Sequence, residues 1–286
     1  LNMISPAFAG LFSLNLSPSK TKVVRLSFLL VLSFLTLNSV AQDRTVRLMT
    51  YNILNYRNTT SYCTSSNNSS SNKEGHLETI ISEIEPDVVV MNEIGSNPNN
   101  LTYLLNNAFN TGSATNWAMA NHVHNGFSSL VNGVAYRSDV LEITNQWAIT
   151  KDADNNSLVR AIDIVRFYYK DALLQGNSDT ATFVVIGAHF KAGNSSFDAA
   201  QRNQAATAIV DWIDAHNFEN VFLLGDLNTY SSNESSFQSL IGGNTFRFED
   251  PITSNGNWHN NSNFASIHTQ STRTSGNCHS GGGLDD

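Results

Sequence analysis

The chain has 286 residues, enough for one large domain or two small ones with a substantial hydrophobic core. Hydrophobic residues make up 41% of it, as in globular proteins, and charged residues only 14%, so uncharged polar residues must cover much of the surface. The formal net charge of -8 argues against a broad, non-specific grip on nucleic acid or on an anionic membrane. A local phosphate site is still compatible with this charge, because a bound metal ion can supply positive charge.

The beginning of the chain predicts export. Three basic residues between Lys20 and Arg25 precede an apolar stretch over residues 26–37, and Ser39-Val40-Ala41 follows it. This order is typical of a secretory signal peptide. An uncleaved anchor helix is the alternative, but the apolar stretch is well short of the ~20 residues that a membrane-spanning helix needs. We therefore expect a secreted, periplasmic or cell-surface protein. The expected parts are an upstream extension, a signal peptide and one domain, at residues 1–19, 20–41 and 42–286.

The first part of the expected domain contains two strands and one helix. Residues 45–52 predict a strand that leads into a loop. Segment 58–72 is almost wholly asparagine, serine and threonine, which is typical of a surface loop. Apolar residues at positions 77, 80, 81 and 84 follow helical spacing and predict an amphipathic helix, which a proline ends. Residues 88–91 predict a second buried strand.

The rest of the domain is predicted to be rich in strands. A polar hairpin is expected around residues 176–179, a helix over 199–216 and a last buried strand over 221–225. No internal repeat or linker divides the sequence. The remaining predicted strands cover residues 117–120, 131–137, 141–149, 162–169 and 182–188.

Four of the buried strands end in polar residues with complementary chemistry. Any one such residue is ordinary turn or capping chemistry, but polar side chains gathered at the ends of neighbouring strands are where α/β proteins build active sites. The five residues are Asn52, Glu93, His189, Asp226 and Asn228.

These side chains suit a metal-assisted phosphate site. Glu93 and Asp226 offer hard oxygen ligands for Mg²⁺ or Ca²⁺. Asn52 and Asn228 can hold a water or a phosphate oxygen without adding negative charge. His189 titrates near neutrality and can donate a proton to a phosphoryl oxygen or a leaving group.

Five motifs carry a resemblance to a known family. They are Thr50-Tyr51-Asn52-Ile53-Leu54, Pro86–Glu93, Gly133–Arg137, Gly187–Lys191 and Leu224–Asn228. In this order they resemble the endonuclease/exonuclease/phosphatase superfamily, which includes pancreatic-type deoxyribonucleases, abasic-site endonucleases, sphingomyelinases and inositol-polyphosphate phosphatases. The resemblance covers about residues 44–286 and specifies fold better than substrate. It implies an α/β fold: a four-layer αββα sandwich of two mixed, mainly antiparallel sheets packed face to face, with helices outside and the site at one end of both sheets.

The resemblance also implies a role for each site residue. Glu93 matches the family's metal-binding glutamate and Asn52 the asparagine beside that metal, which is Mg²⁺, with Mn²⁺ or Ca²⁺ as alternatives. His189 matches the histidine that contacts the scissile phosphate. Asp226 matches the aspartate that orients the attacking water, and Asn228 its phosphate-binding neighbour.

Two departures from the family pattern bear on activity. Arg160 matches a phosphate-binding arginine, but Ala161 stands where many members have a proline. The family also ends in a strand bearing an aspartate and a Ser-Asp-His motif, whereas this chain ends at Asp286. Asp285 and Asp286 are both candidates for that aspartate. We therefore expect the printed chain to lack its C-terminal strands and to show little or no catalysis.

The resemblance implies a phosphate-ester hydrolase that depends on a divalent metal. The signal-peptide pattern predicts its export, and a monomer is expected. An endonuclease that cleaves nucleic acid by metal-assisted in-line attack of water is the first expectation. A phosphatase or a sphingomyelinase-like phospholipid phosphodiesterase is the nearest alternative, because neither a basic stripe for a duplex nor a long apolar insertion for a membrane is present. A non-catalytic binding module is the alternative of another class.

Cysteines and further histidines leave open choices. Cys63 and Cys278 either pair, which would tie two rim loops together, or stay as two thiols, and two cysteines are too few for a cysteine zinc site. His122 and His124 have the spacing of metal ligands on a strand, but a surface loop is the simpler interpretation. The histidines of the polar tail, His259, His268 and His279, are expected to be solvated.

Overall fold

A computed structural model describes residues 12–13, 45–112, 116–170, 181–242, 246–267, 269–270, 278 and 284–285. The expected signal peptide, the cleavage site and the hairpin at 176–179 lie outside the described residues, as do His268, His279 and Asp286. Of the expected upstream extension, only the short strand β1 (Phe12–Ser13) is described.

The first sheet follows the order β1-β2-β3-β5-β4. Its long strands β2 (Arg47–Tyr56) and β3 (Val88–Gly95) are parallel, and helix α1 (Ser70–Ile84) connects them. β5 (Leu130–Arg137) pairs antiparallel with both β3 and the short β4 (Trp117–Met119). The parallel pair therefore brings the ends of β2 and β3 to the same edge.

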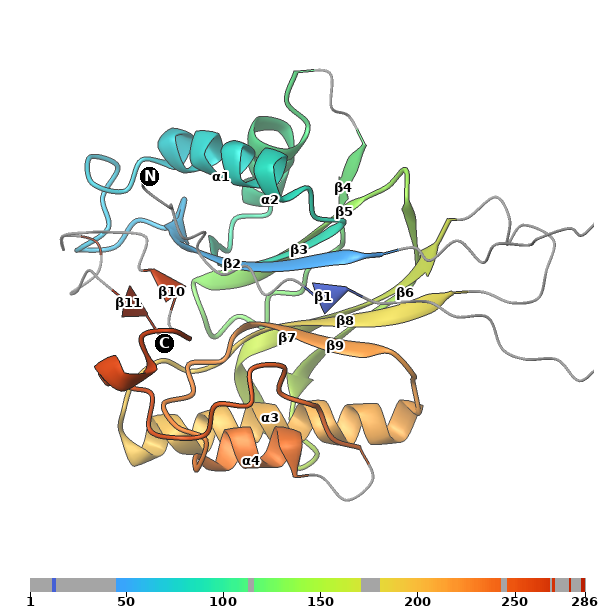
Figure 1. Cartoon of the computed structure of the whole chain (residues 1–286). Coiled ribbons are helices and arrows are strands. Elements are labelled where there is room, and N and C mark those ends of the chain that lie inside the picture. Colours follow the sequence, from blue (N-terminus) through green and yellow to red (C-terminus); the bar gives the residue numbers. More distant parts are fainter. Residues whose placement is uncertain are drawn as a thin grey trace, which may run out of the picture.

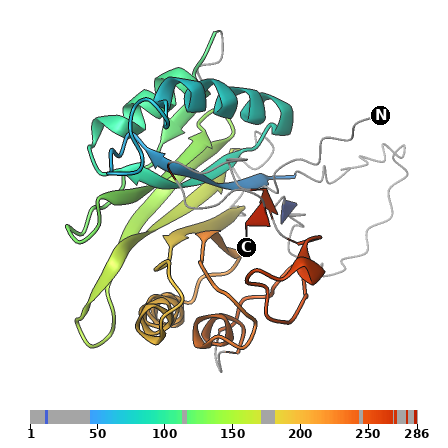
Figure 2. The same ribbon diagram turned by 90° about the vertical axis from the view of Figure 1, so that its left-hand side faces the viewer.

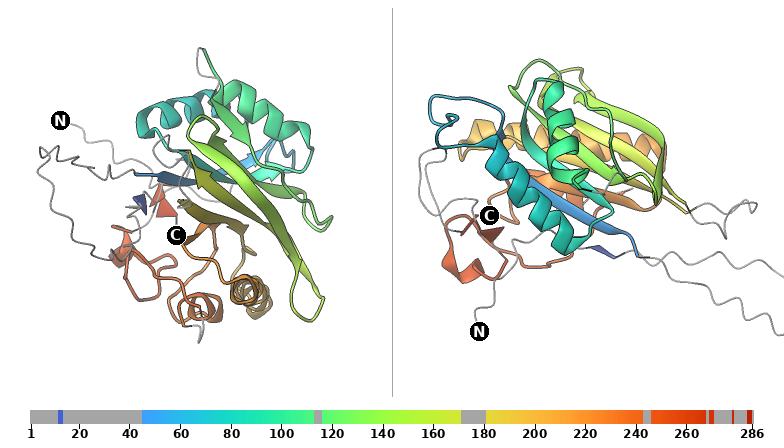
Figure 3. Two further views of the ribbon diagram at one scale, coloured as in Figure 1. Left: turned by 90° about the vertical axis from the view of Figure 1, so that its right-hand side faces the viewer. Right: turned by 90° about the horizontal axis from the view of Figure 1, so that it is seen from above.

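The second sheet follows the order β6-β7-β8-β9. β6 (Leu141–Lys151), β7 (Ser157–Tyr169) and β8 (Thr182–His189) are antiparallel neighbours. β8 and β9 (Val221–Asp226) are parallel and are connected by α3 (Ser196–His216). The long β6–β7 ribbon runs down one side of the molecule (Figure 3). A small separate pair joins β10 (Thr269–Gln270) to β11 (Leu284–Asp285).

The layers form the αββα sandwich that the resemblance implies. α1 and α2 (Asn99–Leu104) cover the outer face of the first sheet, and α3 and α4 (Ser235–Ile241) that of the second (Figures 1 and 2). α2 continues into a π-helical turn at Leu105–Phe109. A single 3-10 turn occurs at Ser262–Phe264 among the described residues. None of the described helices combines the length and the apolar character that a membrane crossing requires.

Each interface between layers has its own apolar core. Strand β3 shows why the run Val88–Met91 is apolar at every position: Val88 and Val90 pack between the two sheets, while Val89 and Met91 pack under the helices of the first sheet. All four are fully buried, and alternating side chains of one strand point to opposite faces. The third core lies between the second sheet and α3, where Ile209 is fully buried. β3 is thus covered on both faces and contributes to two of the three cores.

The predicted strands and helices are all present, with differences at their ends. α1 begins at Ser70, seven residues before its first predicted apolar position, because Ser69 caps the helix by accepting a hydrogen bond from the Asn72 N–H group. The predicted surface loop 58–72 is therefore too long at its end. The helical segment 99–109 was not predicted, and β7 begins five residues earlier than expected.

Candidate active site at the ends of the two sheets

The ends of β2, β3, β8 and β9 meet at one edge of the sandwich, on the left in Figure 1. Asn52 joins the two sheets there. Its Nδ2 donates to Glu93 Oε1 at 3.0 Å and to Asp226 Oδ2 at 2.9 Å, while its Oδ1 accepts the Leu54 N–H group at 2.9 Å. One amide group therefore holds two carboxylates from different sheets against each other.

A histidine completes a cluster of possible metal ligands. His189 Nε2 lies 3.9 Å from Asp226 Oδ2, and one ligand atom from each of Glu93, His189 and Asp226 lies within 4.8 Å of the other two. This is the one group of at least three such residues within the described parts of the chain. Two carboxylates are the protein ligands that Mg²⁺ usually takes, with substrate and water completing its shell. The residues present therefore fit a divalent cation.

The backbone at the site departs from ordinary strand geometry. Glu93 has φ 64° and Asn228 has φ 49°, in the left-handed region that non-glycine residues rarely adopt. At Gly225, with φ 142°, a Cβ atom would lie 1.8 Å from the Ala188 carbonyl oxygen, so only glycine fits where β9 crowds β8. Such conformations cluster at functional sites, where the surrounding structure must hold them.

Asn228 folds back onto the strand end that carries Asp226. Its N–H group donates to Asp226 Oδ1 at 3.1 Å, and its Nδ2 donates to the Phe190 carbonyl oxygen at 3.3 Å. Both residues therefore face the same end of β8, and the Asp226 carboxylate has one oxygen toward Asn228 and the other toward Asn52 and His189. The turn thus orients the carboxylate rather than merely reversing the chain.

Arg160 also reaches the site, although Ala161 replaces the expected proline. Its Nη1 donates to the Phe190 carbonyl oxygen at 2.8 Å, and its buried Nε has no partner among the described residues. Burial lowers the pKa of Arg160 below its usual value, while the charges of Glu93 and Asp226 oppose that shift. A guanidinium of this kind has donors to offer to a phosphate.

The expectation that His189 titrates near neutrality was wrong. This histidine is buried, and burial together with the positive charge of Arg160 lowers its pKa well below the usual value. Its Nδ1 is buried and has no partner among the described residues. The structure thus brings all six predicted site residues together, while the role of each stays a prediction.

Three buried polar residues beneath the site were not predicted. Asn92 is fully buried between the sheets; its Oδ1 accepts the Asp226 N–H group at 3.0 Å, and its Nδ2 donates to Asn132 Oδ1 at 2.9 Å. Asn132 in turn donates to Asp163 Oδ2 at 3.4 Å. Asn132 and Asp163 could have been found in the sequence, because each is a single polar residue inside an apolar run.

Asp163 is the acid of this buried network. Its Oδ1 accepts the Val123 N–H group at 3.2 Å. Burial raises the pKa of Asp163 to about 7, although the hydrogen bonds from Val123 and Asn132 favour the charged form and lower it. The carboxyl group therefore titrates near neutral pH.

The two cysteines form a disulfide, which decides between the two alternatives for them. His122 and His124 lie in the loop between β4 and β5 and join no group of three possible metal ligands among the described residues. His259 is half-buried and stacks on Tyr230 with ring centroids 4.2 Å apart, so the expectation that it is merely solvated was wrong. Its neighbouring aromatic ring excludes water from one of its faces.

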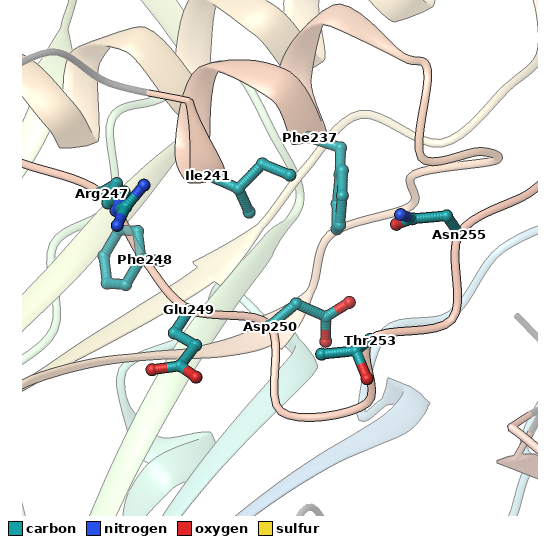
Figure 4. A pocket seen from close by; sticks show the side chains of 8 residues that line it. All are labelled: Phe237, Ile241, Arg247, Phe248, Glu249, Asp250, Thr253 and Asn255. Atoms are coloured by element: carbon teal, nitrogen blue, oxygen red, sulfur yellow. The ribbon is translucent and has the colours of Figure 1, made fainter.

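A hollow of about 500 Å³ lies beside α4, away from these residues. Figure 4 shows Phe237 and Ile241 of α4 on one side of it, and Glu249, Asp250 and Thr253 of the following loop on the other. None of the six site residues lines it. The chemistry at the sheet ends, rather than this hollow, marks the candidate active site.

Comparison with known proteins agrees with this fold. The sequence profile of the Endonuclease/Exonuclease/phosphatase family matches residues 49–278. An endonuclease/exonuclease/phosphatase from Bacteroides vulgatus is similar in structure, with 18% identity, a TM-score of 0.51 and coverage of 70% of this chain and 71% of that one. A mannosyl-6-phosphatase of Bacteroides thetaiotaomicron has 12% identity, a TM-score of 0.50 and coverage of 69% and 70%. No curated protein matches the chain.

Proposed function

The chain belongs to the Endonuclease/Exonuclease/phosphatase family, and on that premise we propose that it is a phosphoesterase that depends on a divalent metal. The observation that carries the proposal is the cluster of Glu93, His189 and Asp226 at the ends of four strands, bridged by Asn52. We propose Mg²⁺ as the ion, with Mn²⁺ or Ca²⁺ as substitutes, because the donors are mainly hard oxygens.

Glu93 and Asn52 are the proposed metal-binding residues. A bound divalent cation would neutralise negative charge that develops on the phosphoryl oxygens. Glu93 offers a carboxylate already held in place by Asn52. Asn52 presents its Nδ2 to the carboxylates, so a bond from its Oδ1 to the ion requires the amide to turn over and release the Leu54 N–H group.

The second sheet supplies the groups that handle water and phosphate. Asp226 orients a water molecule for in-line attack and takes up its proton. A neutral His189 with its proton on Nε2 donates a hydrogen bond to a phosphoryl oxygen. Arg160 and the Asn228 amide bind the remaining phosphate oxygens.

We propose an endonuclease acting on nucleic acid as the first candidate substrate class. A phosphatase is the second. The excess of 24 aspartates and glutamates over 16 lysines and arginines argues against broad binding of a polyanion, but it leaves a local phosphate site open and does not choose between the two. A phospholipid phosphodiesterase of the same fold is the remaining option.

A substrate panel with 5 mM Mg²⁺ or Mn²⁺ separates these classes. It contains supercoiled plasmid, RNA, a phosphate diester and a phosphate monoester of p-nitrophenol, and sphingomyelin vesicles, each with an EDTA control. Metal-dependent nicking with little monoester turnover supports the nuclease; the reverse pattern supports the phosphatase. Metal binding without turnover of any substrate contradicts the proposed phosphoesterase activity. Metal-dependent turnover of any of them contradicts the sequence-based expectation of little or no catalysis.

Export and a monomeric state are also proposed. The Cys63–Cys278 disulfide supports export, because disulfides persist in oxidising compartments. Mass spectrometry of the protein from the producing cell and its medium tests this: a mature chain that begins near Gln42 outside the cytoplasm is expected. A full-length chain confined to the cytoplasm would contradict export. Sedimentation of the purified protein tests the monomer.

A further inference from the structure

β2 leaves its regular pairing with β3 at the metal-binding end. The register shifts between Asn52 and Tyr56, and Leu54 and Asn55 both have positive φ, 45° and 51°. Two successive left-handed residues turn their N–H groups away from the ladder. The Leu54 N–H group points to Asn52 Oδ1, and the Asn55 N–H group donates to Glu93 Oε2 at 2.9 Å. Successive backbone N–H groups in such a turn form an anion-binding concavity.

Both oxygens of the Glu93 carboxylate are therefore held. Oε1 accepts from the Asn52 side chain and Oε2 from the Asn55 backbone. Glu93 itself has a left-handed backbone and lies where β3 loses its regular pairing with β5, between Met91 and Ile94. Hydrogen bonds to a ligand from residues behind it orient that ligand and tune its affinity for the metal.

The conformation of Asn55 depends in turn on the loop 57–69. Its Nδ2 donates to Cys63 Sγ at 3.5 Å, and its Oδ1 accepts from Asn58 Nδ2 at 2.8 Å. Its carbonyl oxygen accepts from Asn68 Nδ2 at 2.9 Å. Three side chains of one loop thus hold a residue whose backbone is left-handed, a conformation that asparagine adopts more readily than most residues.

The disulfide anchors this loop. Cys63 and Cys278 pack with Leu54 in a small buried cluster of their own, apart from the three main cores. Most other residues of the loop are polar, and Tyr62 is 72% exposed. The covalent bond therefore replaces the hydrophobic packing that holds other parts of the fold.

From these contacts we propose that Asn55 is a positioning residue that links the Cys63–Cys278 disulfide to the metal-binding Glu93, so that reduction of the disulfide weakens metal binding. The inference rests on the proposed function of Glu93. Reduction consumes a dithiol, which gives two electrons and two protons to the protein disulfide and leaves as its own disulfide. The freed loop then no longer holds the Asn55 N–H group against Glu93.

Mn²⁺ affinity, measured by electron paramagnetic resonance well below the melting temperature, is the test. We expect the dissociation constant to rise ~10- to 100-fold on reduction with dithiothreitol. C63S/C278S, which has no cysteine, should show the same rise without dithiothreitol and no further change with it. Asn55→Ala should show a similar rise. Asn55→Gly should show a smaller one, because glycine adopts positive φ freely. Tyr62→Ala, in the same loop but exposed, is the matched control and should bind like wild type.

The melting temperature of the metal-free protein separates positioning from plain stability. If reduction and Asn55→Ala lower that temperature but leave Mn²⁺ affinity at the low temperature unchanged, the coupling is refuted. Glu93→Gln separates this outcome from failure of the proposed function. If Glu93→Gln abolishes Mn²⁺ binding while reduction leaves the Mn²⁺ affinity of wild type unchanged, only the coupling fails. If Glu93→Gln binds Mn²⁺ as tightly as wild type, the proposed metal site itself is wrong.

Discussion

The two sheets build their halves of the site in different ways. In the second sheet, His189 and Asp226 are direct partners in a regular parallel ladder between β8 and β9. In the first sheet, β2 and β3 lose their register between Asn52 and Tyr56, and Glu93 takes a left-handed backbone. Main-chain pairing thus places one half, whereas side-chain hydrogen bonds and a disulfide hold the other. The position of His189 and Asp226 therefore depends on strand pairing, whereas that of Glu93 depends on contacts with distant segments.

Loss of the first-sheet carboxylate should have the largest effect. Glu93→Gln keeps the size of the side chain but removes the charge that would bind the cation, so metal-dependent hydrolysis should fall ~1,000-fold or more, in line with loss of electrostatic stabilisation. The rate of hydrolysis of the best substrate of the panel measures this. Gln146→Ala, distant in sequence and on β6, is the control. Activity within a few-fold of wild type in Glu93→Gln would remove Glu93 from the site.

The second-sheet half should be sensitive to its buried support. Asn92→Ala removes the buried acceptor of the Asp226 N–H group and the donor to Asn132 Oδ1, so the free energy of unfolding should fall by about 3–5 kcal/mol. Urea denaturation measures the loss. The same change at exposed Asn145 should cost less than about 0.5 kcal/mol. Equal losses at both positions would show that the buried network does not support Asp226.

Removal of the disulfide should destabilise the first-sheet half less than this. C63S/C278S opens a link between residues 215 apart in sequence, and about 2–4 kcal/mol of unfolding free energy should be lost. Hydrogen exchange should show the loss first in segment 53–69, while the amides of β8 and β9 stay protected. Uniform loss of protection across both sheets would contradict the contrast between the two halves.

The smallest expected effect concerns the pH dependence of stability. The folded state raises the pKa of Asp163 to about 7, so it retains a proton that the unfolded chain releases near pH 4. The stabilisation is full below pH 4 and is lost as pH rises through 7, which makes wild type about 2–3 kcal/mol less stable at pH 8 than at pH 5 from this group alone. Asp163→Asn, which cannot ionise, should flatten the difference in urea titrations at both pH values. If Asp163→Asn shows the same dependence of unfolding free energy on pH as wild type, that dependence comes from other groups.

The residues at the strand ends could be predicted because their identity and position are local. Asn52, Glu93, His189 and Asp226 each follow an apolar run, and five motifs in order implied the αββα sandwich. What holds them could not be predicted. The left-handed turn at Leu54 and the Asn92 bridge between the sheets depend on contacts between distant segments. Whether Cys63 and Cys278 pair was equally undecided, because nothing in their local sequences distinguishes a disulfide from two thiols.

Crystals soaked with Mn²⁺ would test the metal site most directly. Anomalous scattering should reveal one ion within about 2.2 Å of a Glu93 carboxylate oxygen, in the space bounded by Asn52, His189 and Asp226. An ion at that place would support metal-assisted phosphoester hydrolysis as the chemistry of this fold. No ion at saturating Mn²⁺, or an ion bound only elsewhere, would contradict it.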